Sequence, residues 1–325
     1  MGILQHKKIL FVGPIFYDYH SKISAALQGY GAEVHFIPER EYNFIYKALG
    51  YLNKALAYAY SNVHFLRKIR SVKDGASFDF VFIVHGETIT RTVFFAMKKQ
   101  FPNAKFINYH WDSLKFNHRA TLLLDQYDAV YSFDREDVNK YPSLRYKPLF
   151  HNNERPAVPS SLKYDMLFIG VDYSDRYQIL QQLSGEASRH GLTCKPMLIT
   201  SKFSFYRKKL LGHKAYRSAR AEEFIYEKIP YQTFLQLTNE SSAVIDINFE
   251  GQAGLTMRTI EVLAMGKKLI TTNPYIMNEA FYSPDSVLVI DRHHPVIDPH
   301  FFKRQASPVN MSKLLLRNWV TEFFV

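Results

Sequence analysis

A loop, a short helix and a buried strand are predicted by the stretch Gly254-Leu-Thr-Met-Arg-Thr-Ile-Glu-Val-Leu-Ala-Met-Gly-Lys-Lys-Leu-Ile-Thr-Thr272. This order places backbone N–H groups, Arg258 and Glu261 together at the start of the helix. Unpaired N–H groups and the helix dipole favour an anion there, and a nearby arginine suits a phosphate. A carboxylate one turn further along the helix would repel that phosphate. Glu261 is compatible with the phosphate if the carboxylate binds neutral hydroxyls beside it, such as those of a ribose. The stretch therefore predicts a nucleotide-sugar site.

Short apolar segments alternate with helical patterns through the first half of the chain. A continuous apolar run is typical of a strand that is covered on both faces of a sheet. The predicted strands are Ile9–Gly13, Glu33–Pro38, Phe78–Val84, Ala104–Tyr109 and Tyr127–Phe133. Such strands alternating with helices predict an α/β fold with a doubly wound parallel sheet.

The chain changes character at His151–Ser161, a polar segment with two prolines and the composition of a linker. A second strand–helix series follows it, with predicted strands at 165–170, 194–199, 243–247 and 287–290. We therefore expect two Rossmann-like domains, 1–155 and 156–310, and a C-terminal helix over 311–325 that packs back on the first domain. Ligands bind beyond the carboxyl ends of strands in such sheets, so we expect the domains to face a cleft.

Composition limits the class of protein. Hydrophobic residues make up 47% of the 325 residues, which is ample material for two cores and excludes global disorder. The single cysteine, Cys194, excludes a disulfide framework and a cysteine-built zinc site, as expected in the reducing cytoplasm. We see neither a signal peptide nor an apolar run that would span a bilayer. The net charge of +11 attracts polyanions, such as nucleic acid, anionic lipid or phosphorylated substrates.

The second series resembles the donor domain of GT-B glycosyltransferases, which are built from two Rossmann-like domains and use nucleotide sugars. The segment Arg258-Thr-Ile-Glu261-Val-Leu-Ala264-Met-Gly266 is similar to the Arg-x-x-Glu-x-x-Ala-x-Gly motif of the family. The motif occurs in bacterial members that build capsule or lipopolysaccharide and in the CgeB-like group. Phe168-Ile-Gly170, followed by Asp172 and Arg176, resembles the first strand and phosphate-side loop of that domain.

The resemblance implies roles for residues of this chain. It implies that Glu261 binds the ribose and that Arg176 and Arg258 bind the diphosphate. Gly170 and Gly254 are expected to allow a close backbone approach or a positive φ in the donor loops. Residues 156–310 become the donor domain and 1–155 the acceptor-side domain. A UDP-sugar is the expected co-substrate, with no bound cofactor and no catalytic metal.

The chain departs from the family at one position. Many retaining members carry a Glu-x7-Glu motif, and its first carboxylate would fall at Ala253. Glu250 lies too early to replace it, so retaining stereochemistry is unsupported. No G-x-G-x-x-G follows the first strand, so a nicotinamide or flavin cofactor is not expected.

Polar residues that follow strands of the first half are candidates for a catalytic base, which accepts the proton of an attacking hydroxyl. Asp112 is the favoured base, and His85 and Glu87 at the neighbouring strand end are its rivals. The alternatives are that Asp112 caps a helix and that His85 is a satisfied histidine near the core. On the acceptor side we expect Tyr17, Asp18 and His110.

Two basic and aromatic stretches carry much of the excess charge. One covers residues 45–70 at roughly helical spacing, and the other is Ser201–Arg220. Basic amphipathic helices lie on anionic membranes, which would suit an acceptor attached to a lipid carrier. The alternative is a solvated surface. His293, His294 and His300 lie near carboxylates, but their spacing matches no metal-ligand set.

These observations favour a cytoplasmic glycosyltransferase, peripheral on the inner face of the membrane. Its acceptor would be a hydroxyl of a surface glycan or a lipid-linked oligosaccharide. The alternative is a non-catalytic protein that binds a polyanion, supported by the net charge of +11. No nucleic-acid-binding motif is present, so no specific nucleic-acid partner is expected. A sugar-phosphate enzyme of similar two-domain shape, such as an epimerase, is a third possibility.

Overall fold

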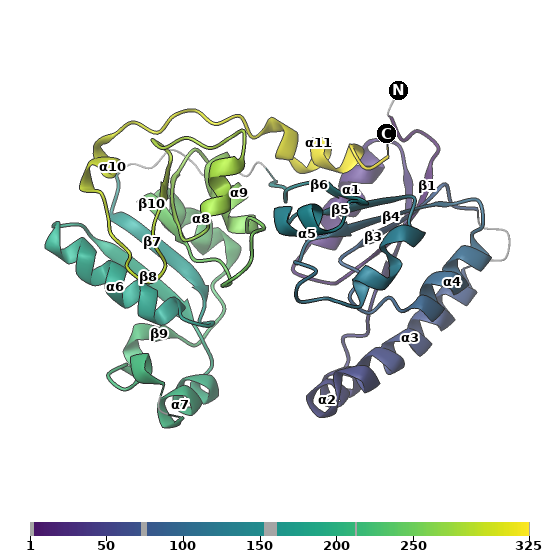
Figure 1. Cartoon of the computed structure of the whole chain (residues 1–325), viewed down its shortest axis with the longest axis horizontal. Helices are drawn as coiled ribbons and strands as arrows, with labels where there is room; N and C mark the ends of the chain where they lie inside the picture. Colours follow the sequence, from purple (N-terminus) through teal and green to yellow (C-terminus); the bar gives the residue numbers. More distant parts are fainter. Residues whose placement is uncertain (1–2, 73–76, 153–160, 212, 325) are drawn as a thin grey trace. The chain divides into compact units, whose positions relative to one another are not determined.

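The structure is a computed structural model that describes residues 3–72, 77–152, 161–211 and 213–324 (Figure 1). The chain divides into two compact units. Unit 1 comprises Met1–Leu149 and Leu314–Val325, and unit 2 comprises Phe150–Lys313. The predicted domain boundary at residues 155–156 lies outside the described residues.

Unit 1 contains a six-stranded parallel sheet in the order β2-β1-β3-β4-β5-β6. Its strands are β1 (Lys8–Gly13), β2 (Glu33–Pro38), β3 (Phe80–Val84), β4 (Lys105–His110), β5 (Ala129–Ser132) and β6 (Leu144–Tyr146). Its helices are α1 (Tyr19–Gly29), α2 (Phe44–Leu52), α3 (Lys54–Ser71), α4 (Arg91–Gln100), α5 (Arg135–Lys140), α11 (Leu316–Thr321) and the 3-10 helix η1 (Ala120–Gln126). The 3-10 helix η5 (Ser312–Leu314) begins in unit 2 and ends at the first residue of the C-terminal part of unit 1. Strands β1 to β5 overlap the five predicted segments.

Helices cover both faces of this sheet (Figure 1). α3 and α4 pack on one face, where α3 buries residues at four-residue intervals: Ala57, Ser61, Phe65 and Ile69. α1 and α11 cover the other face. The Trp319 ring of α11 lies 5.0 Å from the Tyr109 ring, and its Nε1 donates to the Pro148 carbonyl at 2.8 Å. The C-terminal segment thus completes the core of unit 1, with a helix shorter than the one predicted over 311–325.

Unit 2 contains a second six-stranded parallel sheet, in the order β12-β11-β10-β7-β8-β9. Its strands are β7 (Tyr164–Val171), β8 (Cys194–Ile199), β9 (Phe224–Ile225), β10 (Ser241–Asp246), β11 (Lys268–Thr271) and β12 (Val287–Val289). Its helices are α6 (Arg176–Arg189), α7 (Lys202–Leu210), α8 (Tyr231–Asn239), α9 (Met257–Ala264), α10 (Pro299–Lys303) and the 3-10 helices η2 (Lys214–Tyr216), η3 (Ala221–Glu223) and η4 (Pro274–Asn278).

The strand order places a switch point in each sheet. Successive strands run away from β1 and β3 in opposite directions in unit 1, and from β7 and β10 in unit 2. Loops at the carboxyl ends of such strands leave space between them for a ligand. The loops that follow these strands are therefore the expected place of a ligand site in each unit.

The helical stretch predicted through residues 45–70 is interrupted. Asn53 ends α2, and its side-chain oxygen accepts the N–H of Ala55 at 2.7 Å at the start of α3. Asparagine favours this capping role because its short side chain reaches the first free N–H groups of a helix. Within the described residues, no helix is long and apolar enough to cross a membrane.

Candidate functional site

Three side chains form a hydrogen-bonded line at the carboxyl edge of the unit 1 sheet. His85 follows β3, and its Nδ1 lies 3.0 Å from Oε1 of Glu39, the residue after β2. Its Nε2 lies 3.0 Å from Oδ2 of Asp112, just beyond β4. The side chain of Glu39 is fully buried, whereas that of Asp112 is 60% exposed. Asp112 and His85, predicted as alternatives, are therefore in contact, and Glu39 joins them without having been predicted.

The two carboxylates hold His85 in its protonated form. Burial by itself lowers the pKa of an imidazole, but the charge of Glu39 and hydrogen bonds to Asp112 and Glu39 raise the pKa of His85 to about 10. At neutral pH both ring nitrogens therefore donate, and His85 has no lone pair to accept a proton. Its backbone φ of 72° lies in the left-handed region, which non-glycine residues rarely adopt. Of the three groups, the exposed carboxylate of Asp112 is the one suited to accept a proton.

The charge of His85 links folding stability to pH. Its pKa of about 10 in the folded protein exceeds its ordinary value, so the folded state binds the proton more tightly. This stabilisation is fully present below about pH 6.5 and is lost as the pH rises towards 10, by up to about 1.4 kcal/mol per pH unit. Urea unfolding across this pH range should show that the free energy of unfolding falls more steeply with pH in wild type than in Glu39→Gln. Parallel curves would contradict a raised pKa of His85.

Aromatic side chains from two loops lie beside His85. The Trp111 ring is 6.2 Å from the His85 ring and 6.2 Å from the ring of Phe16, in the loop after β1. The next residue, Tyr17, is 78% exposed and has a φ of 45°. Asp18 is exposed on the same loop and precedes α1. The predicted acceptor-side residues Tyr17 and Asp18 therefore adjoin an open aromatic surface near His85, of the kind that lines ligand sites.

His110 and Glu87 are less suited to proton transfer. His110 ends β4 with a buried side chain, and burial together with the charge of His85 lowers its pKa to about 3. Glu87 accepts from Nη1 of Arg40 at 2.8 Å and from the hydroxyl of Tyr58 at 2.6 Å. Both carboxylate oxygens of Glu87 are thus engaged in structural contacts.

Two arginines predicted to bind diphosphate lie at the carboxyl edge of the unit 2 sheet. Arg176 begins α6, and its Nε and Nη2 donate to the Ile247 carbonyl at 3.0 and 2.7 Å. Its Nη1 donates to the Val171 carbonyl at 3.0 Å. Arg258, in the first turn of α9, donates from Nη1 to the Ile169 carbonyl. These bonds fix both guanidinium groups beside the ends of β7 and β10.

A third arginine, Arg292, joins them from the segment after β12. Its Nε and Nη2 donate to the two carboxylate oxygens of Asp175, both at 2.7 Å, and its Nη1 donates to the Asn248 carbonyl at 3.1 Å. Such a two-pronged bond fixes the plane of the guanidinium group. Arg292 was not predicted, although it follows the predicted strand at 287–290 as Arg176 follows the one at 165–170.

The three arginines lie close enough to influence one another. Burial lowers the pKa of Arg176, the carboxylate of Asp246 opposes this, and the charges of Arg258 and Arg292 lower the pKa further. The Nε of Arg258 is buried and has no hydrogen-bond acceptor among the described residues. Binding of an anion beside these guanidinium groups would offset their repulsion.

The N-terminus of α9 is fixed to the end of β10. Thr256 caps the helix by accepting the N–H of Thr259 at 3.2 Å, and the hydroxyls of both residues donate to Asp246 at 2.7 Å. Glu261 lies one turn after Arg258 and is half-buried. The predicted loop, helix and strand are all present in this segment, with the helix at Met257–Ala264.

The glycines of the donor loops have different roles. A Cβ at Gly170 would lie 2.9 Å from the Phe168 ring and 3.4 Å from Nη1 of Arg258, so glycine leaves the space through which Arg258 reaches β7. Gly254 is buried. Neither of these glycines has the positive φ offered as an alternative, and the left-handed residue of the loop before α9 is Gly251, with a φ of 76°.

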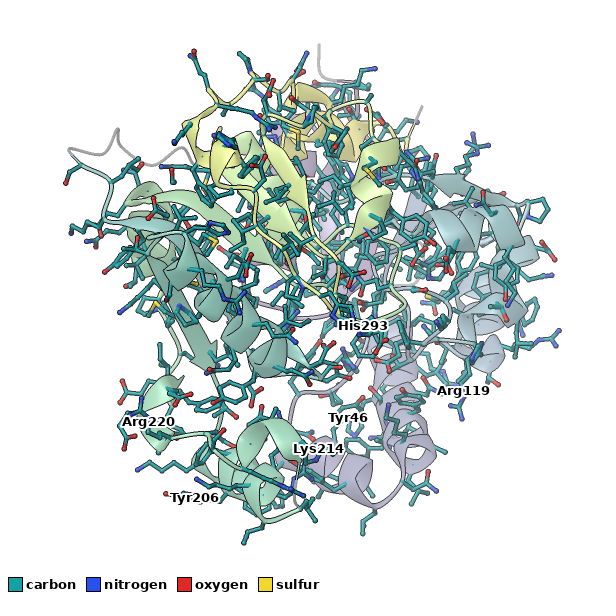
Figure 2. The ribbon with its side chains drawn as sticks, turned by 60° about the vertical axis from the view of Figure 1, so that its left-hand side comes forward. Tyr46, Arg119, Tyr206, Lys214, Arg220 and His293 are labelled. Atoms are coloured by element: carbon teal, nitrogen blue, oxygen red, sulfur yellow. The ribbon has the colours of Figure 1, made fainter. Side chains whose placement is uncertain are left out.

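The histidines near the C-terminus form a turn. The backbone N–H groups of His293 and His294 donate to Oδ1 of Asp291 at 2.8 and 2.7 Å, and His293 is labelled in Figure 2. Across the described ranges, no group of three or more His, Cys, Asp or Glu side chains is placed to hold a metal ion.

The predicted basic segment Ser201–Arg220 is built around α7, which carries Tyr206 (Figure 2). Phe203 on the outer side of α7 is 78% exposed. On the inner side, Nζ of Lys208 lies 2.9 Å from Oδ2 of the buried Asp172. An open cavity of about 360 Å³ beside α7 contains none of the predicted donor residues and is lined by Lys202, Tyr206, Ala221, Glu222, Phe224 and Tyr226.

The sequence matches no protein-family model and no curated protein. Solved structures share the fold over nearly the whole chain. Sucrose-phosphate synthase from Thermosynechococcus elongatus superposes with a TM-score of 0.56 at 12% identity, covering 98% of this chain and 95% of that one. Anabaena HepE in complex with UDP and glucose gives a TM-score of 0.56 at 10% identity, covering 98% of this chain and 96% of that one.

The UDP-GlcNAc 2-epimerase from Methanocaldococcus jannaschii gives a TM-score of 0.57 at 9% identity, covering 97% of this chain and 98% of that one. Sequence identities this low are evidence for a shared fold alone. With two parallel six-stranded sheets, each covered by helices, the chain has the GT-B fold that its sequence predicts.

Proposed function

We propose that this protein is a glycosyltransferase that moves a sugar from a nucleotide-diphosphate sugar to a hydroxyl group. The arginine cluster of unit 2 is the observation that carries the proposal. Arg176, Arg258 and Arg292 gather at the ends of β7 and β10, with Asp175 pairing Arg292, at the switch point where doubly wound sheets bind nucleotides. Charge fixed there would stabilise the diphosphate that leaves as the glycosidic bond breaks.

The donor we propose is a UDP-sugar. HepE, which shares the fold, has been solved in complex with UDP-glucose. Glu261 lies one turn beyond Arg258 on α9, so it is assigned the ribose hydroxyls while Arg258 takes the diphosphate. Gly170 supports this role of Arg258 by leaving room for its side chain.

Asp112 is proposed as the catalytic base. The acceptor hydroxyl would attack the anomeric carbon of the donor sugar and pass its proton to Asp112. The bond from that carbon to the diphosphate oxygen would break, and the oxygen would keep the electron pair. Glu39 and His85 act as positioning residues, because they hold one oxygen of Asp112 and leave the carboxylate open to solvent. Ala253, in place of a carboxylate, agrees with a single inverting displacement.

The acceptor we propose is a surface glycan or a lipid-linked oligosaccharide, glycosylated in the cytoplasm at the inner face of the membrane. The aromatic surface of Phe16, Tyr17 and Trp111 beside His85 supports a sugar acceptor, because ring faces pack on the apolar faces of ligands. The exposed apolar and basic helices α2 and α7 support a lipid surface.

Product analysis tests the proposal. Incubation with UDP-sugars and a panel of free and lipid-linked glycans should release UDP only when an acceptor is present, and should lengthen that acceptor by one sugar. The shared fold of the M. jannaschii epimerase makes epimerisation the second candidate. A product in which the altered sugar is still attached to UDP would therefore contradict transfer. A protein that only binds polyanions would release no UDP, and its nucleic-acid affinity would fall steeply with salt.

A further inference from the structure

The short helix α2 presents its apolar face to solvent. None of the nine residues of α2 is buried. Phe44 and Ile45 in its first turn are 82% and 53% exposed, and Tyr51 and Leu52 in its last turn are 93% and 80% exposed. Residues seven apart lie on one side of a helix, so these four side chains form a single stripe. A stripe of large exposed apolar side chains marks a site of interaction.

The opposite side of α2 attaches it to unit 1. Tyr46, labelled in Figure 2, and Gly50 are half-buried, and a Cβ at Gly50 would lie 3.9 Å from the Cβ of Ala57 on α3. Asn53 ends α2 and caps α3, so the chain turns sharply between them. Figure 1 shows α2 at the far end of α3, away from the sheet of unit 1. The fold thus holds the stripe outward.

Two exposed lysines flank this stripe. Residues 42–72 contain no aspartate or glutamate. Lys47 lies within α2 and Lys54 follows it, and both are exposed. Each cation close to an anionic bilayer strengthens binding by about five-fold.

We propose that α2 docks unit 1 on an anionic lipid bilayer. Phe44, Ile45, Tyr51 and Leu52 would enter the boundary between headgroups and acyl chains, and Lys47 would lie among the headgroups. A protein partner fits less well, because a stable protein interface takes about 20–30 residues from each side. The stripe offers four side chains on a helix only about 13 Å long. Aromatic rings are also common at the boundary of a bilayer with water.

The inference extends the proposed function, since it names the surface on which a lipid-linked acceptor would be met. Only the biological role of the docking surface rests on the proposed function. Binding of the protein to a vesicle needs neither donor nor acceptor, so the two proposals fail separately. Titration of UDP into the α2 variants, expected to match wild type, keeps the two results distinct.

Vesicle flotation with the full chain tests the docking proposal. We expect binding to vesicles of phosphatidylcholine mixed with phosphatidylglycerol, and at least about ten-fold weaker binding to phosphatidylcholine alone. Phe44→Ser combined with Leu52→Ser should weaken binding to the mixed vesicles by about 100-fold, because burying each side chain contributes roughly ten-fold. Both side chains are largely exposed, so the fold should survive the change. Leu122→Ser, at a 64% exposed position of η1, is the matched control and should bind like wild type.

Three outcomes would overturn the proposal. One is absence of wild-type binding to the mixed vesicles, and another is unchanged binding of the double variant. Loss of binding confined to Leu210→Ser with Leu211→Ser, at the exposed end of α7, would assign lipid contact to unit 2 instead. A concentration-dependent dimer that the α2 double variant abolishes would identify a second copy of the chain as the occupant, and would also overturn docking on lipid.

Discussion

Replacing Arg258 with alanine is expected to lower kcat/KM for sugar transfer by about 10²–10³-fold, as loss of one fixed charge donor at a developing anion commonly does. Arg258 is held at the end of β7 by its bond to the Ile169 carbonyl, and its buried Nε has no acceptor among the described residues. In our account the positive charge of Arg258 stabilises the leaving diphosphate. Steady-state rates with a UDP-sugar donor and the best acceptor provide the measurement.

A control is needed because Arg258 also supports the fold. Arg189→Ala removes an arginine of the same unit whose side chain is 76% exposed and pairs with Glu186, and it should transfer at the wild-type rate. Arg258→Lys keeps the positive charge, so its kcat/KM should lie between those of wild type and Arg258→Ala. If Arg258→Ala, shown to be folded by thermal unfolding, transfers as fast as Arg189→Ala, the role assigned to Arg258 is wrong.

Asp112→Asn is expected to lower kcat by about 10²–10⁴-fold, because the amide cannot accept the proton of the attacking hydroxyl. The change keeps the shape of the side chain and can still contact the protonated His85, so the fold should be retained. Since the proposed donor residues all belong to unit 2, UDP affinity should be unchanged. Single-turnover rates with saturating donor would isolate this step.

A matched carboxylate separates chemistry from a general loss of charge. Asp125 is exposed on η1 of the same unit, and Asp125→Asn should leave kcat unchanged. Glu39→Gln acts through His85, so it should lower kcat less than Asp112→Asn while altering the pH profile of transfer. A wild-type kcat in Asp112→Asn would remove Asp112 as the base.

The central strands could be predicted because their signal is local. Glu33–Pro38 and Cys194–Ile199 have the predicted bounds, since each is a short extended run ended by a proline or followed by a polar turn. The strands β6 and β9 were missed because three and two residues carry no periodicity. They are edge strands that exist because β5 and β8 offer them a parallel partner.

A contiguous motif gives the sharpest prediction of site residues. Arg258 and Glu261 share one helix, so their spacing was informative. Glu39 and Arg292 owe their importance to partners far along the chain, because Glu39 meets His85 across 46 residues and Arg292 meets Asp175 across 117. A lone charged residue after a strand is usually exposed, so nothing local marked Glu39 as buried. The one sequence feature that could have pointed to Glu39 and Arg292 is that each is a charged residue just after an apolar strand.

The orientation of α2 shows a similar limit of sequence patterns. Helical spacing through residues 45–66 indicated an amphipathic helix, but periodicity does not say whether the apolar face turns inward. The break at Asn53 and the half-buried Tyr46 and Gly50 decide that question, and they turn the stripe to solvent.

Calorimetric titration of UDP into wild type, Arg258→Ala and Glu261→Ala tests the central claim, a nucleotide-sugar site in unit 2, most directly. The account predicts that wild type binds UDP more tightly than CMP and that both variants bind it at least about ten-fold more weakly. Absence of nucleotide binding in wild type, or equal affinity in all three proteins, would contradict it.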